Sequence, residues 1–162
     1  MKKEDNVIIS LLRENSRISL TEMSRLSHVP VSTLYERLKS YQGDFIRKHT
    51  SLVDFSKLGF AARARVLLKV KRTEMPRLKE HLLISSCLNE LYRVNNGYDF
   101  MAEFIFRTMH ELEDYLDKLG TEFALEKEEV FYLVDEFQRE GFMSKGKVLL
   151  IGEKKKGKYE NI

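Results

Sequence analysis

The alternation of side chains between Ala62 and Lys71 constrains the fold of this chain more than any other feature of its sequence. Every second residue from Ala62 to Val70 is apolar, and Arg or Lys fills four of the five alternate positions from Arg63 to Lys71. A period of two residues is typical of a β-strand that buries one of its faces. The segment therefore predicts a strand of a sheet with one face on a hydrophobic core.

The segments after this strand predict a complete α+β domain. Their patterns indicate a helix over residues 75–83, strands over 88–95 and 100–107, a second helix that ends at Gly120, and a strand over 130–137. Asn96-Gly97 predicts a two-residue turn with positive φ at both positions between the middle strands. The order strand-helix-strand-strand-helix-strand is that of a ferredoxin-like domain.

The two predicted helices can cover only one face of a four-stranded sheet. Leu67, Ile105 and Leu133 are expected on the other face among polar neighbours. An apolar patch on an open face favours self-association, although single exposed apolar residues are ordinary.

The first fifty residues have a helical period instead and predict three short helices. Apolar residues from Val7 to Leu12 recur at the spacing of one helix face. Ser19 and Glu22 have the spacing of a capping box before the second helix, and Pro30 suits the first turn of the third. Two short helices joined by a turn form a helix-turn-helix. If a β-wing follows them, residues 1–50 form a winged-helix-like domain. A plain three-helix bundle with a solvated polar face is the alternative.

The exposed face of the third predicted helix carries groups that suit DNA. Its residues are Val31, Ser32, Thr33, Tyr35, Glu36, Arg37 and Lys39. Hydroxyls bond phosphates or base edges, Arg grips guanine, and Glu accepts a hydrogen bond from cytosine. We expect Ser32, Thr33 and Glu36 to read base edges. Arg37 and Lys39 are expected to contact phosphates, and the alternative for Arg37 is to pair with an acidic neighbour.

The segment after the third helix, residues 45–53, is partly β-branched and predicts a wing or a linker strand. Arg47, Lys48 and His49 would then lie near a phosphate backbone, or simply in water.

Charge is distributed unevenly along the chain. Residues 1–50 hold nine Lys/Arg against six Asp/Glu, residues 51–143 hold thirteen against seventeen, and residues 144–162 hold six against two. Basic segments favour polyanions such as nucleic acid, and an acidic middle resists them. An unevenly charged but merely solvated surface is the alternative.

These patterns predict four parts. Residues 1–50 form the DNA-binding head, 51–60 a linker strand or hinge, 61–143 the ferredoxin-like domain, whose open face favours oligomerisation, and 144–162 a basic tail. The tail has an apolar run over residues 148–151 that can add an edge strand. Its lysines are expected in a mobile tail, with a nucleic-acid contact as the alternative.

Several classes of protein are not expected. The single cysteine, Cys87, excludes internal disulfides and multi-cysteine metal clusters, and His28, His49, His81 and His110 are too scattered for a metal site. No nucleophile-base-acid set is visible, so we expect neither an enzyme nor a bound cofactor. The sequence has no long apolar run and no apolar leader, so we expect a cytoplasmic protein with no membrane partner.

Together, the head and the sheet domain resemble the Lrp/AsnC family, the feast/famine transcription regulators. In the head, Asn15–Ser19 matches the family's N-x-R-I-S, Glu22–Ser24 its E-L-S, and Ser32–Leu38 its recognition helix, S-T-V-x-x-R-I. Leu58–Phe60 is similar to the family's hinge, and Val94–Phe100 to its effector turn, V-x-G-x-Y-D-L. The resemblance covers about residues 5–140. It implies a sequence-specific transcription regulator that binds double-stranded DNA as a homodimer or a higher even oligomer.

The resemblance also implies a small effector, most plausibly an amino acid, at a subunit boundary. The implied effector-binding residues are Asn95, Asn96, Gly97, Tyr98 and Asp99. Asp99 would accept the ligand's amine, and its alternative role is to satisfy polar groups beside the hairpin. The sequence departs from the family pattern at His28 and Asn96, where glycine is usual, and at Pro30, where a serine cap is usual.

Two other functions remain open for the same two-domain plan. One is an enzyme similar to the siroheme decarboxylases, which needs Arg and His groups gathered around tetrapyrrole carboxylates. The other is an effector-independent regulator that a partner protein controls.

Overall fold

The computed structural model describes residues 3–144, and the chain divides into two compact units. Among the described residues, the head unit holds 3–51 and 137–144, and the sheet unit holds 52–136. The edge strand and the lysines expected in the tail lie outside the described residues. No helix in the described part of the chain is both long and apolar enough to cross a bilayer.

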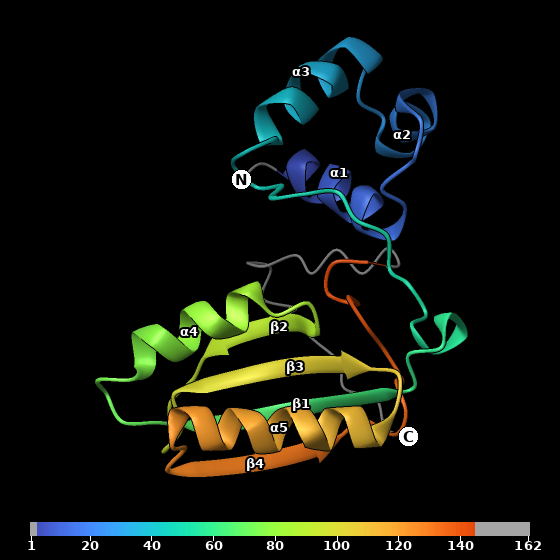
Figure 1. Ribbon diagram of the computed structural model, residues 1–162. Coiled ribbons are helices and arrows are strands. Elements are labelled where there is room, and N and C mark those ends of the chain that lie inside the picture. The colour runs from blue at the N-terminus through green and yellow to red at the C-terminus, as the bar shows by residue number, and fades with distance from the viewer. Residues whose placement is uncertain (1–2, 145–162) are drawn as a thin grey trace, which may run out of the picture. The chain divides into compact units, whose positions relative to one another are not determined.

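The head unit contains the three predicted helices: α1 (Lys3–Glu14), α2 (Leu20–Ser27) and α3 (Val31–Tyr41) (Figure 1). Each contributes to one small core. Its buried members are Ile8, Met23, Val29, Leu34 and Tyr41. This core fixes α3 against the other two helices and leaves the opposite side of α3 in solvent.

The turn between α2 and α3 shows how the unusual residues are accommodated. The Ser19 hydroxyl accepts the Glu22 backbone N–H at 3.1 Å, so the predicted cap is confirmed. The Glu22 carboxylate instead accepts from Arg25 at 3.0 Å. His28 has a left-handed φ of 57°, a conformation that histidine adopts more readily than most residues. Pro30 is the N-cap of α3, one position before its first turn.

The strand predicted over residues 45–53 does not form. Gly43, with φ 87°, turns the chain after α3, and a single bridge joins Gln42 to Ile46. From there the next regular element is a 3-10 helix, η1 (Ser56–Leu58). β-Branched residues favour an extended backbone, but no second segment of the described chain pairs with this one, so the prediction of a wing or linker strand is wrong.

The head unit also includes residues beyond the sheet. The Arg13 guanidinium donates to the backbone carbonyl oxygens of Glu140 and Phe142 at 3.0 and 3.1 Å and pairs with the Glu140 carboxylate at 2.7 Å. Residues 137–144 thus belong with α1, and the predicted domain over residues 61–143 crosses the boundary between the two compact units.

The sheet unit has the predicted order of elements. They are β1 (Ala62–Lys69), α4 (Met75–Ile84), β2 (Leu88–Arg93), β3 (Phe100–Phe106), α5 (Met109–Phe123) and β4 (Lys127–Tyr132). The strands lie in the order β2-β3-β1-β4, and every neighbouring pair is antiparallel (Figure 1). This is the ferredoxin-like α+β arrangement that the alternation at Ala62 predicts.

One core joins both helices to the same face of the sheet. Val66 of β1 and Phe104 of β3 are fully buried together with Leu82 of α4 and Leu112 of α5. Within residues 52–136, neither helix packs on the opposite face of the sheet, as predicted.

Two element ends differ from the prediction. Gly120 does not end α5, which continues to Phe123 and closes at Ala124 with a φ of 45°. Leu119 and Phe123 are buried on the sheet, so tertiary packing outweighs the low helix propensity of glycine. β4 covers Lys127–Tyr132 and not residues 130–137, because its pairing partner β1 begins only at Ala62.

The turn between β2 and β3 agrees with the prediction in conformation and differs in length. Asn96 and Gly97 have φ values of 61° and 89°. The closing hydrogen bond runs from the Val94 N–H to the Asp99 carbonyl at 3.1 Å, so residues 95–98 form the loop. Asparagine tolerates this left-handed conformation, which explains how it replaces the expected glycine.

Candidate nucleic-acid interface

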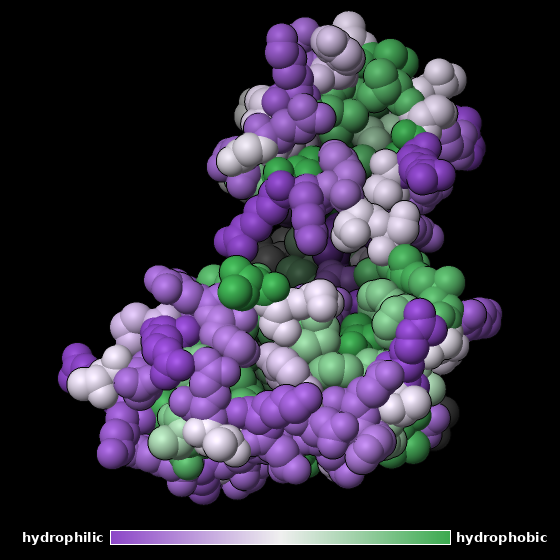
Figure 2. All heavy atoms as spheres, in the orientation of Figure 1, coloured by the Kyte–Doolittle hydropathy of each residue, from purple (hydrophilic) through white to green (hydrophobic). Residues whose placement is uncertain are grey.

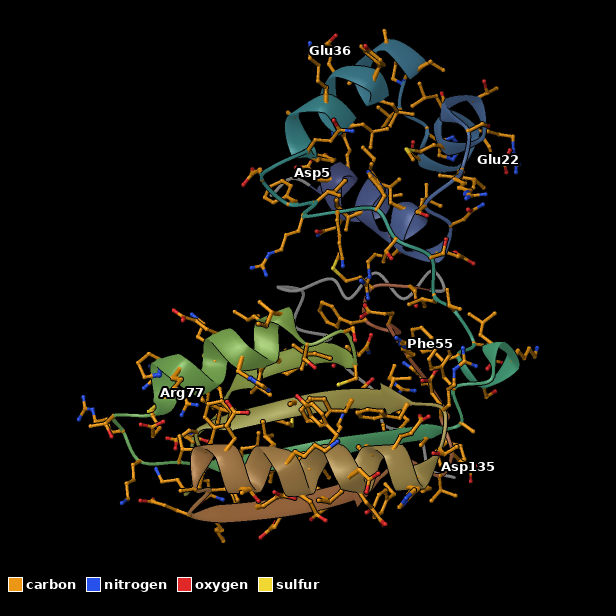
Figure 3. All side chains as sticks on the ribbon, in the orientation of Figure 1. Asp5, Glu22, Glu36, Phe55, Arg77 and Asp135 are labelled. Atoms are coloured by element: carbon orange, nitrogen blue, oxygen red, sulfur yellow. The ribbon has the colours of Figure 1, made fainter. Side chains whose placement is uncertain are left out.

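The outer side of α3 presents the side chains that the sequence predicts for base contacts. Ser32, Thr33 and Glu36 are exposed, whereas Leu34 between them is fully buried in the head core. Val31 and Tyr35 are 43% and 56% exposed, so their apolar surface also reaches solvent. In Figure 3, Glu36 points away from α1, the helix on which Asp5 lies. The helix therefore offers hydroxyl, carboxylate and apolar groups on one face.

Hydrophobic residues also gather beside this face. Figure 2 shows them over α2 and the start of α3, within an otherwise mostly hydrophilic surface. Leu26 and Val31 are 42% and 43% exposed. Exposed apolar side chains at the start of a recognition helix are suited to contact thymine methyl groups.

Arg37 has a different environment from its neighbours on α3. Its guanidinium donates to the Asp5 carboxylate at 3.1 Å and to the Glu4 carboxylate, both at the start of α1. The Tyr41 hydroxyl donates to the same Asp5 oxygen at 2.6 Å. The expectation that Arg37 contacts phosphates does not fit this geometry, because two carboxylates already hold its guanidinium. The acidic neighbour considered as the alternative is what the structure provides.

This contact fixes the orientation of α3. Burial and the hydrogen bond to Asp5 raise the pKa of Tyr41 to about 12, so its hydroxyl stays protonated and donates at physiological pH. The side chain of Asp5 is only 15% exposed. A half-buried carboxylate with two donors from α3 ties α3 to α1.

Among the residues predicted to contact phosphates, Lys39, Arg47 and Lys48 face solvent. All three are exposed, and no salt bridge joins any of them to the described residues. Lys39 comes from the last turn of α3, and Arg47 and Lys48 follow the bridge at Ile46. Unpaired cations beside a polar helix face are suited to contact phosphates.

The hairpin predicted for effector binding is built differently from the expectation. Asn95, Asn96 and Gly97 are exposed. The Asp99 carboxylate, in contrast, accepts the Val70 backbone N–H at 3.1 Å and the Lys69 ammonium at 3.2 Å. The side chain of Asp99 is 12% exposed. Its alternative role, satisfying polar groups beside the hairpin, therefore describes its geometry.

Tyr98 lies on the same hairpin beside a second lysine. The Lys127 ammonium is 4.4 Å from the centre of the Tyr98 ring. The polar interaction with the Tyr98 side chain raises the pKa of Lys127. No sequence pattern places Lys69 or Lys127 at this hairpin. Lys69 approaches it through the pairing of β1 with β3, and Lys127 through the pairing of β1 with β4, which no local pattern specifies.

The open face of the sheet carries an ionic cluster that the sequence analysis missed. Glu103 of β3 is 1% exposed and accepts hydrogen bonds from Arg63 at 2.9 Å, Arg65 at 3.0 Å and Asn89 at 2.7 Å. Glu90 lies 3.5 Å from Arg65. The alternation of β1 had put both arginines on this face, and the same period along β3 puts Glu103 there.

The protonation of Glu103 follows from its partners. Burial alone would raise the pKa of this carboxyl group. The hydrogen bonds from Arg63, Asn89 and Arg65 outweigh burial and hold the pKa below its ordinary value. Glu103 is therefore ionised at neutral pH and pairs with both arginines on the open face.

Metal-ligating side chains are not gathered into a site among residues 3–144. No group of three or more His, Cys, Asp or Glu side chains there could hold a metal ion. Cys87 is half-buried, and its sulfur lies 3.0 Å from the Ser85 hydroxyl oxygen. His81 is 3.9 Å from Glu122 and His110 is 3.6 Å from Asp114, each on its own part of the sheet unit.

Comparison with known proteins identifies similar sequences and folds, although no family model matches the chain. The chain is 29% identical over 118 residues to the HTH-type transcriptional regulator FL11 of Pyrococcus abyssi, a match that covers 72% of this chain and 78% of that protein. The solved structure of Bacillus subtilis LrpC has a TM-score of 0.77 at 22% identity, over 85% of this chain and 97% of that chain.

A second solved structure is a transcriptional regulator of Neisseria meningitidis in complex with L-Met. Its TM-score is 0.79 at 14% identity, and it covers 86% of this chain and 93% of that chain. At these identities the two solved structures establish a shared fold across both units.

Proposed function

The chain belongs to the Lrp/AsnC family of DNA-binding transcriptional regulators, and from this membership we propose that α3 of the head unit binds duplex DNA in the major groove. The observation that carries the proposal is the exposed polar face of α3. Ser32, Thr33 and Glu36 reach solvent there, while the bonds from Arg37 and Tyr41 to Asp5 hold the helix in place. An α-helix fits the major groove of B-DNA, and its first turns contact base edges.

Each exposed group has a distinct proposed role. Ser32, Thr33 and Glu36 read base edges, and Val31 and Tyr35 add apolar contacts. Lys39, Arg47 and Lys48 pair with phosphates, which fixes the register without reading sequence. Arg37 acts within the protein as a positioning residue for α3.

Gel-shift titrations of full-length protein against genomic fragments, at two salt concentrations, test this proposal. We expect binding that weakens steeply with salt, because phosphate contacts release counterions. Thr33→Ala should reduce the preference for the best fragment, whereas Lys39→Met should weaken binding to all fragments alike. Folded protein that shifts no fragment at low salt would contradict the proposal.

We further propose that the sheet unit forms the even-numbered oligomer that places two heads on one DNA site. Its helices cover only one face, and the open face exposes Tyr92 by 49% and Phe131 by 52%. Two helix-turn-helix heads about 34 Å apart match one turn of DNA. Light scattering should give at least a dimer, and a clean monomer at micromolar concentration would contradict this.

An amino acid is the proposed effector, with its site near Asn95–Asp99. The support is the L-Met bound to the structurally similar regulator and the exposed, positive-φ turn at Asn96 and Gly97. Because Asp99 is already bonded to Lys69 and Val70, a ligand amine would share this carboxylate and not find it free.

A thermal-shift screen of the amino acids tests the effector. A ligand at a hundred times its dissociation constant should stabilise the protein by about 2.7 kcal/mol. An Asn95→Ala variant should lose the response and keep its own melting temperature, since Asn95 is exposed. If no amino acid raises the melting temperature, control by a partner protein becomes the better description.

The proposal assigns no enzymatic activity to the chain. The names of its relatives are those of transcriptional regulators, which favours regulation over catalysis. The enzyme similar to siroheme decarboxylases would copurify with or bind a tetrapyrrole. An absorption spectrum after addition of a tetrapyrrole separates the two functions, because a regulator should leave the spectrum unchanged.

A further inference from the structure

A hollow in the head unit has the size of a small-molecule site. It lies between the end of α1, the start of α2, the last turns of α3 and the segment after Gly43, and its volume is about 510 Å³. Ligand sites in proteins usually measure about 300–1,000 Å³ and have mostly apolar walls with a few polar groups. All residues that line this hollow belong to the head unit.

The floor of the hollow is apolar and incompletely covered. Leu12, Ile18, Leu20, Leu38 and Ile46 line it, and each is only half-buried. The head core is therefore open toward the hollow, where the fully buried Met23 also forms part of the lining. A hydrocarbon group placed here would remove apolar surface of the protein from water, which is favourable in proportion to the area covered.

The rim of the hollow is cationic and carries hydrogen-bond donors. Tyr35, Lys39 and Gln42 follow one another at i, i+4 and i+7, so they form one stripe along α3, and His49 stands on another side. No Asp or Glu lines the hollow. No ion pair engages Lys39 among the described residues. A positive rim over an apolar floor is complementary to a molecule with a hydrocarbon body and one negative group.

We propose that this hollow binds a small apolar carboxylic acid. Its hydrocarbon part packs against Leu20 and Leu38, and its carboxylate pairs with Lys39. This site is separate from the proposed effector hairpin, which lies in the sheet unit. It rests on the proposed function in one respect: Tyr35 and Lys39 also belong to the proposed DNA-contacting set, so the acid and DNA compete for the same lysine. Binding of one must then weaken binding of the other by the same factor.

Calorimetric titration of the full-length protein without DNA tests the site directly. Octanoate and 3-phenylpropanoate are the carboxylate probes, and octanamide and octylamine are the matched neutral and cationic probes. We expect saturable binding of the carboxylates. Octanamide should bind about fivefold more weakly, the factor expected when a partly exposed ion pair is lost. Octylamine should not bind.

Three variants test whether the carboxylate binds in this hollow. Lys39→Met should weaken octanoate about fivefold and leave octanamide unchanged. Ser16→Trp should abolish binding, because Ser16 is exposed at the edge of the hollow and a bulky side chain there fills it without disturbing the core. Arg17→Met is the control: it removes the same charge from an exposed residue outside the lining, and binding should not change.

A gel shift with and without octanoate then tests the coupling. Octanoate should weaken DNA binding of the wild type and have no effect on Ser16→Trp. The inference is overturned if folded wild type binds no carboxylate saturably, if octylamine binds as well as octanoate, or if both Lys39→Met and Ser16→Trp bind octanoate normally. Protein that binds octanoate but no DNA would contradict the proposed function and leave the carboxylate site standing.

Discussion

Glu103 shows how one residue controls the open face of the sheet. It is the only charged side chain among the buried residues of the described chain, and three donors satisfy its carboxylate. A carboxylate with a lowered pKa contributes stability that is present above the unfolded-state pKa and is lost as the pH falls through the folded-state pKa. This side chain should therefore contribute to acid denaturation below its ordinary value of 4.5.

We predict that Glu103→Gln lowers the free energy of unfolding by about 1–3 kcal/mol at neutral pH, since Arg63, Arg65 and Asn89 lose a buried, charged acceptor. The variant should also flatten the loss of stability in the acid range. Urea denaturation at one protein concentration, measured across the acid range, checks both effects. Glu90→Gln is the control, because Glu90 lies at the edge of the cluster and its loss should cost less than about 0.5 kcal/mol. Equal losses in the two variants would contradict this account.

Arg37 and Lys39 carry the same charge on one helix and should respond differently to the same substitution. Arg37→Met should destabilise the head, because the carboxylates of Asp5 and Glu4 lose the guanidinium as a donor. Lys39→Met should change the free energy of unfolding by less than about 0.5 kcal/mol. It should reduce the slope of the logarithm of the DNA-binding constant against the logarithm of salt concentration by about one. Hydrogen exchange of the α3 amides and salt titrations separate the two effects. If the α3 amides stay protected in the Arg37→Met variant, the bonds from Arg37 to Asp5 and Glu4 are not needed to hold α3 in place.

At the scale of elements, α5 illustrates an end that its own residues fix. The Thr108 hydroxyl accepts the Glu111 N–H at 3.2 Å, and the Glu111 carboxylate accepts the Thr108 N–H at 3.4 Å, which completes a capping box. Thr108→Ala should cost about 1 kcal/mol in chemical denaturation. Thr121→Ala on the same helix should be nearly neutral, since that hydroxyl bonds only the Asp117 carbonyl one turn earlier. A cost that is the same for both would rule out the cap as the cause.

At the scale of the whole molecule, the proposed oligomer makes DNA binding depend on helical phase. Inserting about five base pairs between two half-sites turns them to opposite faces of the duplex and should weaken binding, while about ten should restore it. Gel shifts with a spaced series of one operator measure this. Affinity that does not vary with spacing would indicate heads that bind independently.

Local patterns in the sequence determined most of the element order. The period of two at Ala62 predicts β1, the helical stripes predict α1 to α5, and Asn96-Gly97 predicts the positive-φ turn. These features depend on residues within one or two turns or strands, where steric preference and the burial of one face act directly. Motifs of this length also carry the family resemblance.

Tertiary structure alone decided what the key polar side chains do. Arg37 meets Asp5 across 32 positions of the sequence, Asp99 meets Lys69 across 30, and Glu103 meets Arg63 across 40. Such contacts depend on which helix faces cross and on strand register, so no local spacing encodes them. The continuation of α5 past Gly120 has the same origin, because the burial of Leu119 and Phe123 on the sheet outweighs what glycine costs the helix.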